Sequence, residues 1–456
     1  MHDEDDSNLL NASDMPEYEE NHSNYFFWLG ALVVLFLAYK KIKAEREYQK
    51  QKLTPEELLF EEETLFKIKK LPTGFLSRCW GYLTSICLPY FLQLPVNKLY
   101  AYAFSCNLEE AEKEVGEYKS LGDFFCRRLK EGARPLAPDS FLVSPVDGKI
   151  VHFGLVDDEF DEMEQIKEVT YSLTEFLGED SPIVKKIRER RQQRELNYTN
   201  HLAYEQEATD FYYCIIYLAP GDYHGYHSPV DWTATQREHF PGHLFPVSYW
   251  SVSRIEGLFA LNERVVVSGN WKYGEFSYTP VGAYNVGSMD LAFDEELVTN
   301  SDHPPEPLKI YSEPVVLNQG DNIGFFHLGS TVVLVFEAPK MVFTKDRGEK
   351  VKMGEKLAVK LTPELAHLHK KRIEEETIYM DTLYQRKLKA LTSKEMTHEV
   401  ISFKQERLWE QYRVRNKILK ELRQSFYPKV EPDTVEMLKQ KKDELRERVA
   451  KEKEEP

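Results

Sequence analysis

The alternation of short β-prone runs with glycine and proline between residues 119 and 360 restricts the fold more than any other feature of the sequence. Three of these runs are Phe211–Leu218 (FYYCIIYL), Arg264–Ser268 (RVVVS) and Thr331–Phe336 (TVVLVF). Runs of β-branched and aromatic residues that end at turn residues are typical of strands in antiparallel sheets. The sequence therefore predicts an α+β protein with a single β-rich, mostly antiparallel domain over residues 119–360.

Charged segments flank and interrupt this predicted domain. The 456 residues include 59 Lys and Arg against 76 Asp and Glu, a formal net charge of −17, which disfavours nucleic-acid binding through a globally basic surface. Residues 1–24 are acidic and are predicted to be a disordered leader, whereas residues 361–456 predict a charged helical tail for an unknown partner. Inside the domain, residues 155–210 are acidic and then basic. They predict an exposed, helix-containing insertion whose charges form a solvated face.

The most apolar run, Tyr25–Tyr39 (YFFWLGALVVLFLAY), is expected to be a single transmembrane helix. It extends over roughly 22 Å at about 1.5 Å per residue, and the lysines of residues 40–43 extend it by snorkelling. A cleaved signal peptide and a buried core helix are the alternatives. A signal peptide normally begins with basic residues, whereas residues 1–24 contain no Lys or Arg. A buried core helix normally has a polar face, and this run has none. The positive-inside rule alone places the lysine-rich flank in the cytoplasm.

Residues 40–118, which follow this run, predict a helical membrane-proximal region. Its aromatic residues Trp80, Tyr82 and Tyr90 are compatible with contact to lipid or with packing in a core, and core packing is the expectation. The cysteines of the chain are scattered, without a CxxC pair or a metal-like spacing. This arrangement predicts mostly buried thiols and no metal site. The cysteines are Cys79, Cys87, Cys106, Cys126 and Cys214.

Three loop motifs of the β-rich region carry chemically useful side chains. They are Ser144–Gly148 (SPVDG), Gly221–Pro229 (GDYHGYHSP) and Leu328–Thr331 (LGST). Two histidines three residues apart after a strand are compatible with metal binding or with acid–base chemistry. Together the motifs supply an Asp, a His and a Ser, the parts of an activated-serine site. An ordinary serine hydrolase fits poorly, because the serine of LGST lacks the second glycine of a G-x-S-x-G elbow.

A series of ordered motifs between about residues 70 and 358 resembles phosphatidylserine decarboxylase proenzymes of the membrane-anchored, mitochondrial type. Several motifs that agree in order are far more specific than one pattern. In chain order they are FFCRRLKEGARP (Phe124–Pro135), SPVDG, VTYSLTEFLG (Val169–Gly178), DYHGYHSP, PGHLFPV (Pro241–Val247), LFALNERV, VGAYNVGSM and LGSTVVLVFE.

The resemblance implies that the chain cleaves itself between Gly329 and Ser330, into a β chain (1–329) and an α chain (330–456). Ser330 Oγ would attack the Gly329 carbonyl, and the resulting ester would eliminate to dehydroalanine and then hydrolyse to a pyruvoyl group. This group forms a Schiff base with phosphatidylserine and accepts the electrons released when CO2 leaves. The product is phosphatidylethanolamine, and no catalytic metal is required.

The resemblance also implies roles for three loop residues. His227 is the base of self-cleavage, Asp147 orients and stabilises its imidazole, and His224 contacts the substrate or transfers a proton. The sequence departs from the family pattern at Gly225-Tyr226, where an Arg-Phe-like pair is common, which leaves the head-group contacts open. In addition, Tyr284 stands where the family usually has threonine, and Glu131 stands where proline is frequent.

By the same resemblance, the protein lies in the mitochondrial inner membrane with its catalytic domain in the intermembrane space. The acidic N-terminus does not look like a basic, serine-rich transit peptide. Two other functions stay open at this point. One is a non-catalytic membrane tether that uses the predicted span and tail. The other is a serine hydrolase that uses Asp147, His227 and Ser330.

Overall fold

The computed structural model describes residues 70–361 apart from residues 71, 157–161, 167–168, 200–208, 248, 253, 284–287, 305 and 328–329. The predicted leader and membrane span, and the predicted tail beyond residue 361, lie outside this part of the chain. No helix of the described part combines the length and the apolar character that a bilayer crossing requires.

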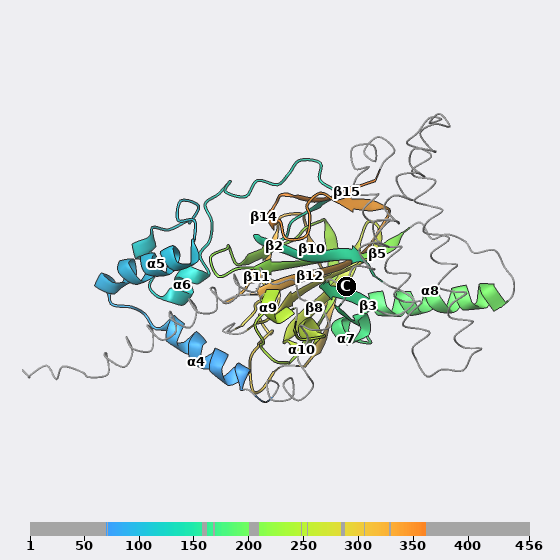
Figure 1. Cartoon of the computed structure of the whole chain (residues 1–456), viewed down its shortest axis with the longest axis horizontal. Coiled ribbons are helices and arrows are strands. Elements are labelled where there is room, and N and C mark those ends of the chain that lie inside the picture. The colour runs from blue at the N-terminus through green and yellow to red at the C-terminus, as the bar shows by residue number, and fades with distance from the viewer. Residues whose placement is uncertain are drawn as a thin grey trace, which may run out of the picture. The chain divides into compact units, whose positions relative to one another are not determined.

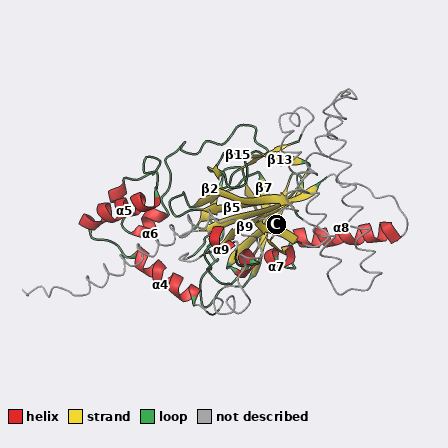
Figure 2. Ribbon diagram, in the orientation of Figure 1, coloured by secondary structure: helices red, strands yellow, loops and turns green. Residues whose placement is uncertain are grey.

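An eight-stranded antiparallel sheet organises the described residues (Figures 1 and 2). The predicted strands of residues 211–218, 264–268 and 331–336 are confirmed, and two of them are neighbours at its centre. β10, which contains Pro314, lies at one edge, where a missing N–H is tolerated. In spatial order the strands are β10 (Leu308–Leu317), β7 (Trp232–Phe240), β8 (Arg264–Trp271), β9 (Gly274–Val281), β12 (Ser330–Ala338), β5 (Asp210–Leu218), β2 (Gly148–Leu155) and β14 (Lys350–Val351).

Smaller sheets and helices surround this sheet. One small sheet contains β1 (Leu142–Val143), β15 (Lys356–Lys360) and β13 (Met341–Phe343), and the others pair β11 (Asn322–Phe325) with β6 (Gly225–His227) and β3 (Glu162–Ile166) with β4 (Val169–Ser172). The described helices are α4 (Thr73–Ser85), α5 (Tyr90–Phe104), η1 (Val115–Glu117), α6 (Leu121–Phe125), α7 (Leu173–Leu177), α8 (Pro182–Thr199), α9 (Tyr249–Val252) and α10 (Leu258–Leu261).

The central strand β12 is buried on both of its faces. Val332 and Leu334 join one hydrophobic cluster, which also contains residues of β13 and β15. Val333 and Val335 join a second cluster, which contains residues of α7, α8 and α10. Successive side chains of a strand point to opposite faces, so the part of β12 that lies between the two cores, residues 332–336, is apolar at every position. This is why the sequence shows an uninterrupted apolar run here.

The insertion of residues 155–210 contains the predicted helix, α8, but its charges do not form a simple solvated face. Lys186 and Arg190 of α8 bind the carboxylate of Glu337 on β12 at 2.6 and 2.5 Å. The Glu337 side chain is only 4% exposed, and a buried carboxylate requires cations and hydrogen-bond donors. Phe176 and Ile183 of the same segment are fully buried in the second cluster. The expectation of an exposed insertion is therefore corrected, because this segment covers one face of the sheet.

Helices α4 and α5 present large apolar side chains to the outside. Tyr82 and Tyr90 are 72% and 85% exposed, so the expectation that they pack in a core is wrong. The next residue, Phe91, is 75% exposed. The buried positions of α4 are small and polar instead, and Thr73 Oγ1 accepts a hydrogen bond from the Leu244 N–H at 3.1 Å. The helix thus joins the β-rich domain through polar contacts and leaves its apolar side chains uncovered.

The expectation of mostly buried thiols is also wrong. Of the five cysteines, Cys214 alone is buried, at the centre of β5. Cys79 and Cys87, in and just after α4, are exposed. The other two, Cys106 and Cys126, are partly exposed, and Cys126 belongs to the site described next.

Candidate active site

Backbone hydrogen bonds bring the predicted site loops together at one end of β5 and β12. Ser330 is the first residue of β12, and its Cα is paired with that of Leu218 at the end of β5, just before the loop that carries His224. The N–H of His227 donates to the Pro145 carbonyl at 2.9 Å, two residues before Asp147. The predicted residues therefore lie on adjoining elements, whereas Gly329 is outside the described residues.

His227 is a neutral imidazole whose two nitrogens both have partners. Nδ1 lies 2.9 Å from the Gly320 carbonyl, which can only accept, so this nitrogen carries the proton. Nε2 consequently accepts, and the Tyr223 hydroxyl donates to it at 3.0 Å. Burial lowers the pKa of His227, and the charge of Asp147 opposes this shift only in part. The base nitrogen thus faces a tyrosine hydroxyl.

Asp147 belongs to a buried ion-pair network that the sequence analysis did not identify. Arg134 donates to both carboxylate oxygens, through Nε at 2.9 Å and Nη2 at 2.5 Å, and the Met353 N–H donates at 2.8 Å. Arg134 also binds Glu110, which in turn binds Lys352 at 2.8 Å. These bonds hold the carboxylate in place, and the influence of Asp147 on His227 that the structure shows is electrostatic. Arg134 lies within the FFCRRLKEGARP motif, and this motif is the sequence signal that could have pointed to it.

His224 is a buried, neutral imidazole with one free lone pair. Its Nδ1 donates to the Asp222 carbonyl at 2.9 Å, and Nε2 has no hydrogen-bond partner among the described residues. Burial lowers the pKa of His224 to about 3, and its ring lies 4.1 Å from that of Phe125. Arg127 donates to the same Asp222 carbonyl at 3.2 Å, which fixes the loop. At neutral pH the bare Nε2 is therefore unprotonated and can accept a hydrogen bond.

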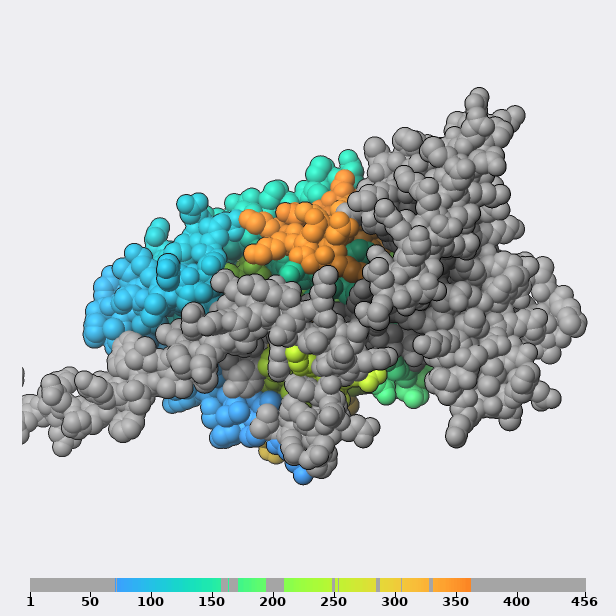
Figure 3. Space-filling view, viewed as in Figure 1, coloured from blue at the N-terminus to red at the C-terminus, as the bar shows by residue number. Residues whose placement is uncertain are grey.

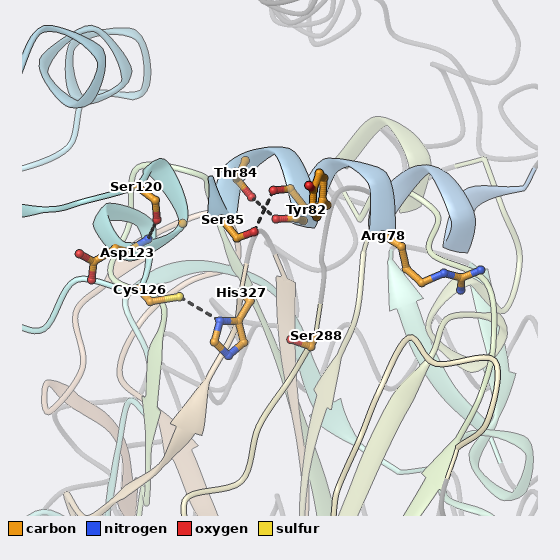
Figure 4. Close-up of a pocket in the computed structure, with 11 residues that line it drawn as sticks. Arg78, Tyr82, Thr84, Ser85, Ser120, Asp123, Cys126, Ser288 and His327 are labelled. Atoms are coloured by element: carbon orange, nitrogen blue, oxygen red, sulfur yellow. Dashed lines mark hydrogen bonds between the residues drawn. The ribbon is translucent and has the colours of Figure 1, made fainter. Parts of the chain in front are cut away.

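A second constellation that the sequence analysis missed lies just before the expected cleavage site. His327 Nε2 lies 2.9 Å from Asp290 Oδ2, and its Nδ1 lies 3.3 Å from Cys126 Sγ (Figure 4). The hydrogen bond to Asp290 and, second, the contact with Cys126 raise the pKa of His327 to about 10. The ring is therefore an imidazolium at neutral pH. Cys126 and His327 are 201 positions apart in the chain, so no local pattern links them.

An open pocket of about 380 Å³ adjoins His327. Residues of α4 form one wall, the start of α6 forms another, and Cys126, Ser288 and His327 line the side next to the β-rich domain (Figure 4). The backbone N–H of His327 donates to the Ser288 carbonyl at 3.0 Å. Residues of the FFCRRLKEGARP, VGAYNVGSM and LGST regions thus meet at one pocket.

Comparisons with known proteins identify the family. The family model of phosphatidylserine decarboxylase matches residues 121–359, more than half of the chain. This chain belongs to the phosphatidylserine decarboxylase family. It is 42% identical over 340 residues to the mitochondrial phosphatidylserine decarboxylase proenzyme of Pongo abelii, a match that covers 71% of this chain and 81% of that protein. It is 38% identical over 367 residues to the mitochondrial phosphatidylserine decarboxylase proenzyme 1 of Saccharomyces cerevisiae, covering 64% and 73%. For the corresponding Arabidopsis thaliana protein the values are 36% over 354 residues, covering 70% and 78%.

The structure accounts for one departure of this chain from the family pattern. A Cβ atom at Gly225 would lie 2.1 Å from the Tyr223 hydroxyl oxygen and 2.9 Å from the Phe325 ring. The space beside position 225 is thus filled by Tyr223, which is bound to His227. An arginine is excluded there unless Tyr223 moves.

Proposed function

We propose that this chain is a precursor that cleaves itself between Gly329 and Ser330 and then decarboxylates phosphatidylserine with a pyruvoyl group formed from Ser330. Membership of the family makes the protein a carboxy-lyase that acts on phosphatidylserine. The observation that carries the rest is the position of Ser330, at the start of β12 beside the loops of His224 and His227. The products are phosphatidylethanolamine and CO2.

Self-cleavage requires a base for the Ser330 hydroxyl while its oxygen attacks the Gly329 carbonyl. Nε2 of His227 is the acceptor, and its lone pair already faces the Tyr223 hydroxyl. We propose that this hydroxyl relays the proton, so that Ser330 gives its proton to Tyr223 while the tyrosine proton passes to Nε2. The Gly320 carbonyl keeps Nδ1 protonated, and the Asp147 carboxylate stabilises the imidazolium that results.

The residues around Ser330 fit a carbonyl cofactor that accepts an amine. The pyruvoyl group supplies an electron-accepting carbonyl, which stabilises the electrons released from the substrate when CO2 leaves. An amine attacks a carbonyl only after it has lost its extra proton. The buried Nε2 of His224, with a pKa of about 3, does not hold that proton at neutral pH, but it has no partner among the described residues and can accept a hydrogen bond from the amine. His224 is therefore placed to orient the attacking amine.

The membrane supplies the substrate, and two features support a membrane location. The apolar run of residues 25–39 is proposed as the anchor in the mitochondrial inner membrane, with the catalytic domain in the intermembrane space. Tyr82, Tyr90 and Phe91 of α4 and α5 are exposed, and both helices belong to the blue-to-cyan part of the surface in Figure 3. Exposed large apolar side chains mark interaction sites, and a lipid surface fits a lipid-modifying enzyme. Several curated relatives carry the word mitochondrial in their names.

Intact-mass analysis of the purified protein tests this function. The expected result is two fragments with a boundary at Gly329–Ser330, the second blocked at its N-terminus by the pyruvoyl group. Ser330→Ala should remain one uncleaved chain, and equal cleavage of that variant would refute the proposal. An uncleaved wild-type chain that releases no CO2 from phosphatidylserine would favour a membrane tether. Labelling of Ser330 by a fluorophosphonate would favour a serine hydrolase.

A further inference from the structure

We propose that the pocket between α4, α6 and His327 binds the phosphodiester of the phospholipid, with His327 as the residue that contacts its negative charge. This inference rests on the proposed function and assigns the head-group contact that position 225 does not supply. His327 lines the pocket and precedes Ser330 by three residues. The pocket volume, about 380 Å³, lies within the usual range of small-ligand sites.

The charge of His327 is fixed by its contacts. Asp290 accepts from Nε2 at 2.9 Å, and the other carboxylate oxygen of Asp290 accepts the Phe325 N–H at 2.7 Å, so both the ring and its counter-ion are anchored to the backbone near β11. The His327 side chain nevertheless stays 43% exposed. Both ring N–H groups already donate, to Asp290 and to Cys126, so the exposed ring meets an anion through its charge unless the anion replaces one of these acceptors.

Two cations line the pocket, His327 and Arg78, and each is paired with a carboxylate. Arg78 binds Asp302 at 3.0 Å and Asn300 at 3.5 Å, whereas His327 is the cation that lies three residues before Ser330 in the chain. The carboxylate of Asp123 accepts the Lys119 N–H at 3.0 Å, and Figure 4 shows it turned away from His327. Among the residues that line this pocket, these are the charged side chains.

The reaction itself selects the phosphodiester over the carboxylate. A cation on the carboxylate would stabilise the substrate in its ground state and would lose that interaction as neutral CO2 departs, which raises the barrier. The phosphodiester keeps its charge throughout, so a cation can hold it without slowing the chemistry. We therefore expect His327 to contact the phosphodiester rather than the carboxylate.

The surroundings of the pocket agree with a lipid substrate. Tyr82 lines the pocket and is 72% exposed on α4, so one residue joins the pocket to the apolar outer surface. A phospholipid can therefore keep its acyl chains at the apolar surface while its head group enters towards His327.

Steady-state kinetics with two substrates test the assignment. Short-chain phosphatidylserine carries the anionic diester, and its phosphate methyl ester is the neutral counterpart. The cleaved wild-type enzyme should show a KM at least tenfold lower for the diester. His327→Gln should raise the KM for the diester about tenfold with little change in kcat and should remove the discrimination, whereas His327→Lys should retain it. His303→Gln, at an exposed loop position, is the matched control.

The outcomes separate this inference from the proposed function. A wild-type enzyme that decarboxylates both substrates with equal KM overturns the phosphodiester site but leaves the decarboxylase intact, and this measurement needs no variant. Equal KM values for wild type and a fully cleaved His327→Gln enzyme overturn the role of His327. A cleaved wild-type chain that releases no CO2 from either substrate refutes the proposed function instead. Intact mass, measured on every variant, reports self-cleavage separately from catalysis.

Discussion

The hydroxyl of Tyr223 lies 3.0 Å from Nε2 of His227, the nitrogen proposed as the base of self-cleavage. If the proton of Ser330 passes through this hydroxyl, Tyr223→Phe should slow self-cleavage at least tenfold, because phenylalanine removes the relay. The rate is measured as the conversion of precursor to fragments after synthesis in vitro.

Tyr311→Phe is the matched control for this change, since its hydroxyl contacts Asp294 at 3.3 Å, outside the site. A Tyr223→Phe precursor that cleaves as fast as wild type, or faster, would show that the hydroxyl competes with Ser330 for Nε2 rather than serving it.

Arg134 should be a major determinant of stability, because it holds the buried carboxylate of Asp147. The two side chains are only 8% and 10% exposed. Arg134→Gln leaves that charge without its partner and should lower the free energy of unfolding by about 3 kcal/mol. Arg134→Lys, which keeps the charge but not the two-point contact, should cost about half as much. Urea unfolding on a Ser330→Ala background measures both, and equal stability of wild type and Arg134→Gln would contradict the prediction.

The neighbouring Glu110 should make stability depend on pH in the acid range. Burial raises the pKa of Glu110, but the hydrogen bonds from Arg134 and Lys352 outweigh it and lower the pKa to about 2. Because the folded state binds this proton less readily than the unfolded state, the contribution of Glu110 is complete above about pH 4.5 and is lost as the pH falls towards 2.

Glu110→Gln should therefore be less stable at pH 7 by about 1–2 kcal/mol and should lose less stability between pH 4.5 and pH 3. Urea unfolding at a series of pH values, again with Ser330→Ala, measures the two slopes. Parallel curves for the two proteins would refute the role assigned to Glu110.

The exposed aromatic residues of α5 should matter for substrate in vesicles and not for dispersed substrate. Changing Tyr90 and Phe91 to Glu places charge on the apolar surface, so the apparent KM on phosphatidylserine vesicles should rise at least tenfold. Short-chain phosphatidylserine below its micelle concentration should react as with wild type. Ile310 and Val316 of the edge strand β10, 71% and 70% exposed, provide the matched double substitution. A similar effect of both pairs would show that α5 has no special contact with lipid.

The central strands were predictable from sequence because burial on both faces requires an unbroken apolar run. That requirement marks β5 and β12 directly. The motifs likewise identified Asp147, His227 and Ser330, which lie on adjoining elements, although the roles of these residues remain predictions. Element order and family could thus be recognised from local patterns alone.

Contacts between distant segments could not be predicted in this way. The partner of Asp147 is a guanidinium 13 positions away, and the partner of His327 is a thiol 201 positions away. Nothing in the local sequence of α8 indicates that Lys186 and Arg190 neutralise a carboxylate on β12. The aromatic residues of α4 and α5 were misassigned for a related reason. Composition identifies apolar side chains, but only the fold shows which of them are buried in a core.

The central position of β12 has a consequence for the mature enzyme. If the chain is cleaved before Ser330 as proposed, β12 belongs to one polypeptide and its two neighbours, β5 and β9, belong to the other. The shorter polypeptide would also contribute β13, β14 and β15, so the fragments would share the eight-stranded sheet and the three-stranded sheet. Complete unfolding would then release two separate molecules, and refolding would become a bimolecular reaction. The precursor can regain its structure at any dilution, whereas the matured enzyme would depend on concentration and on a slow dissociation rate for its lifetime.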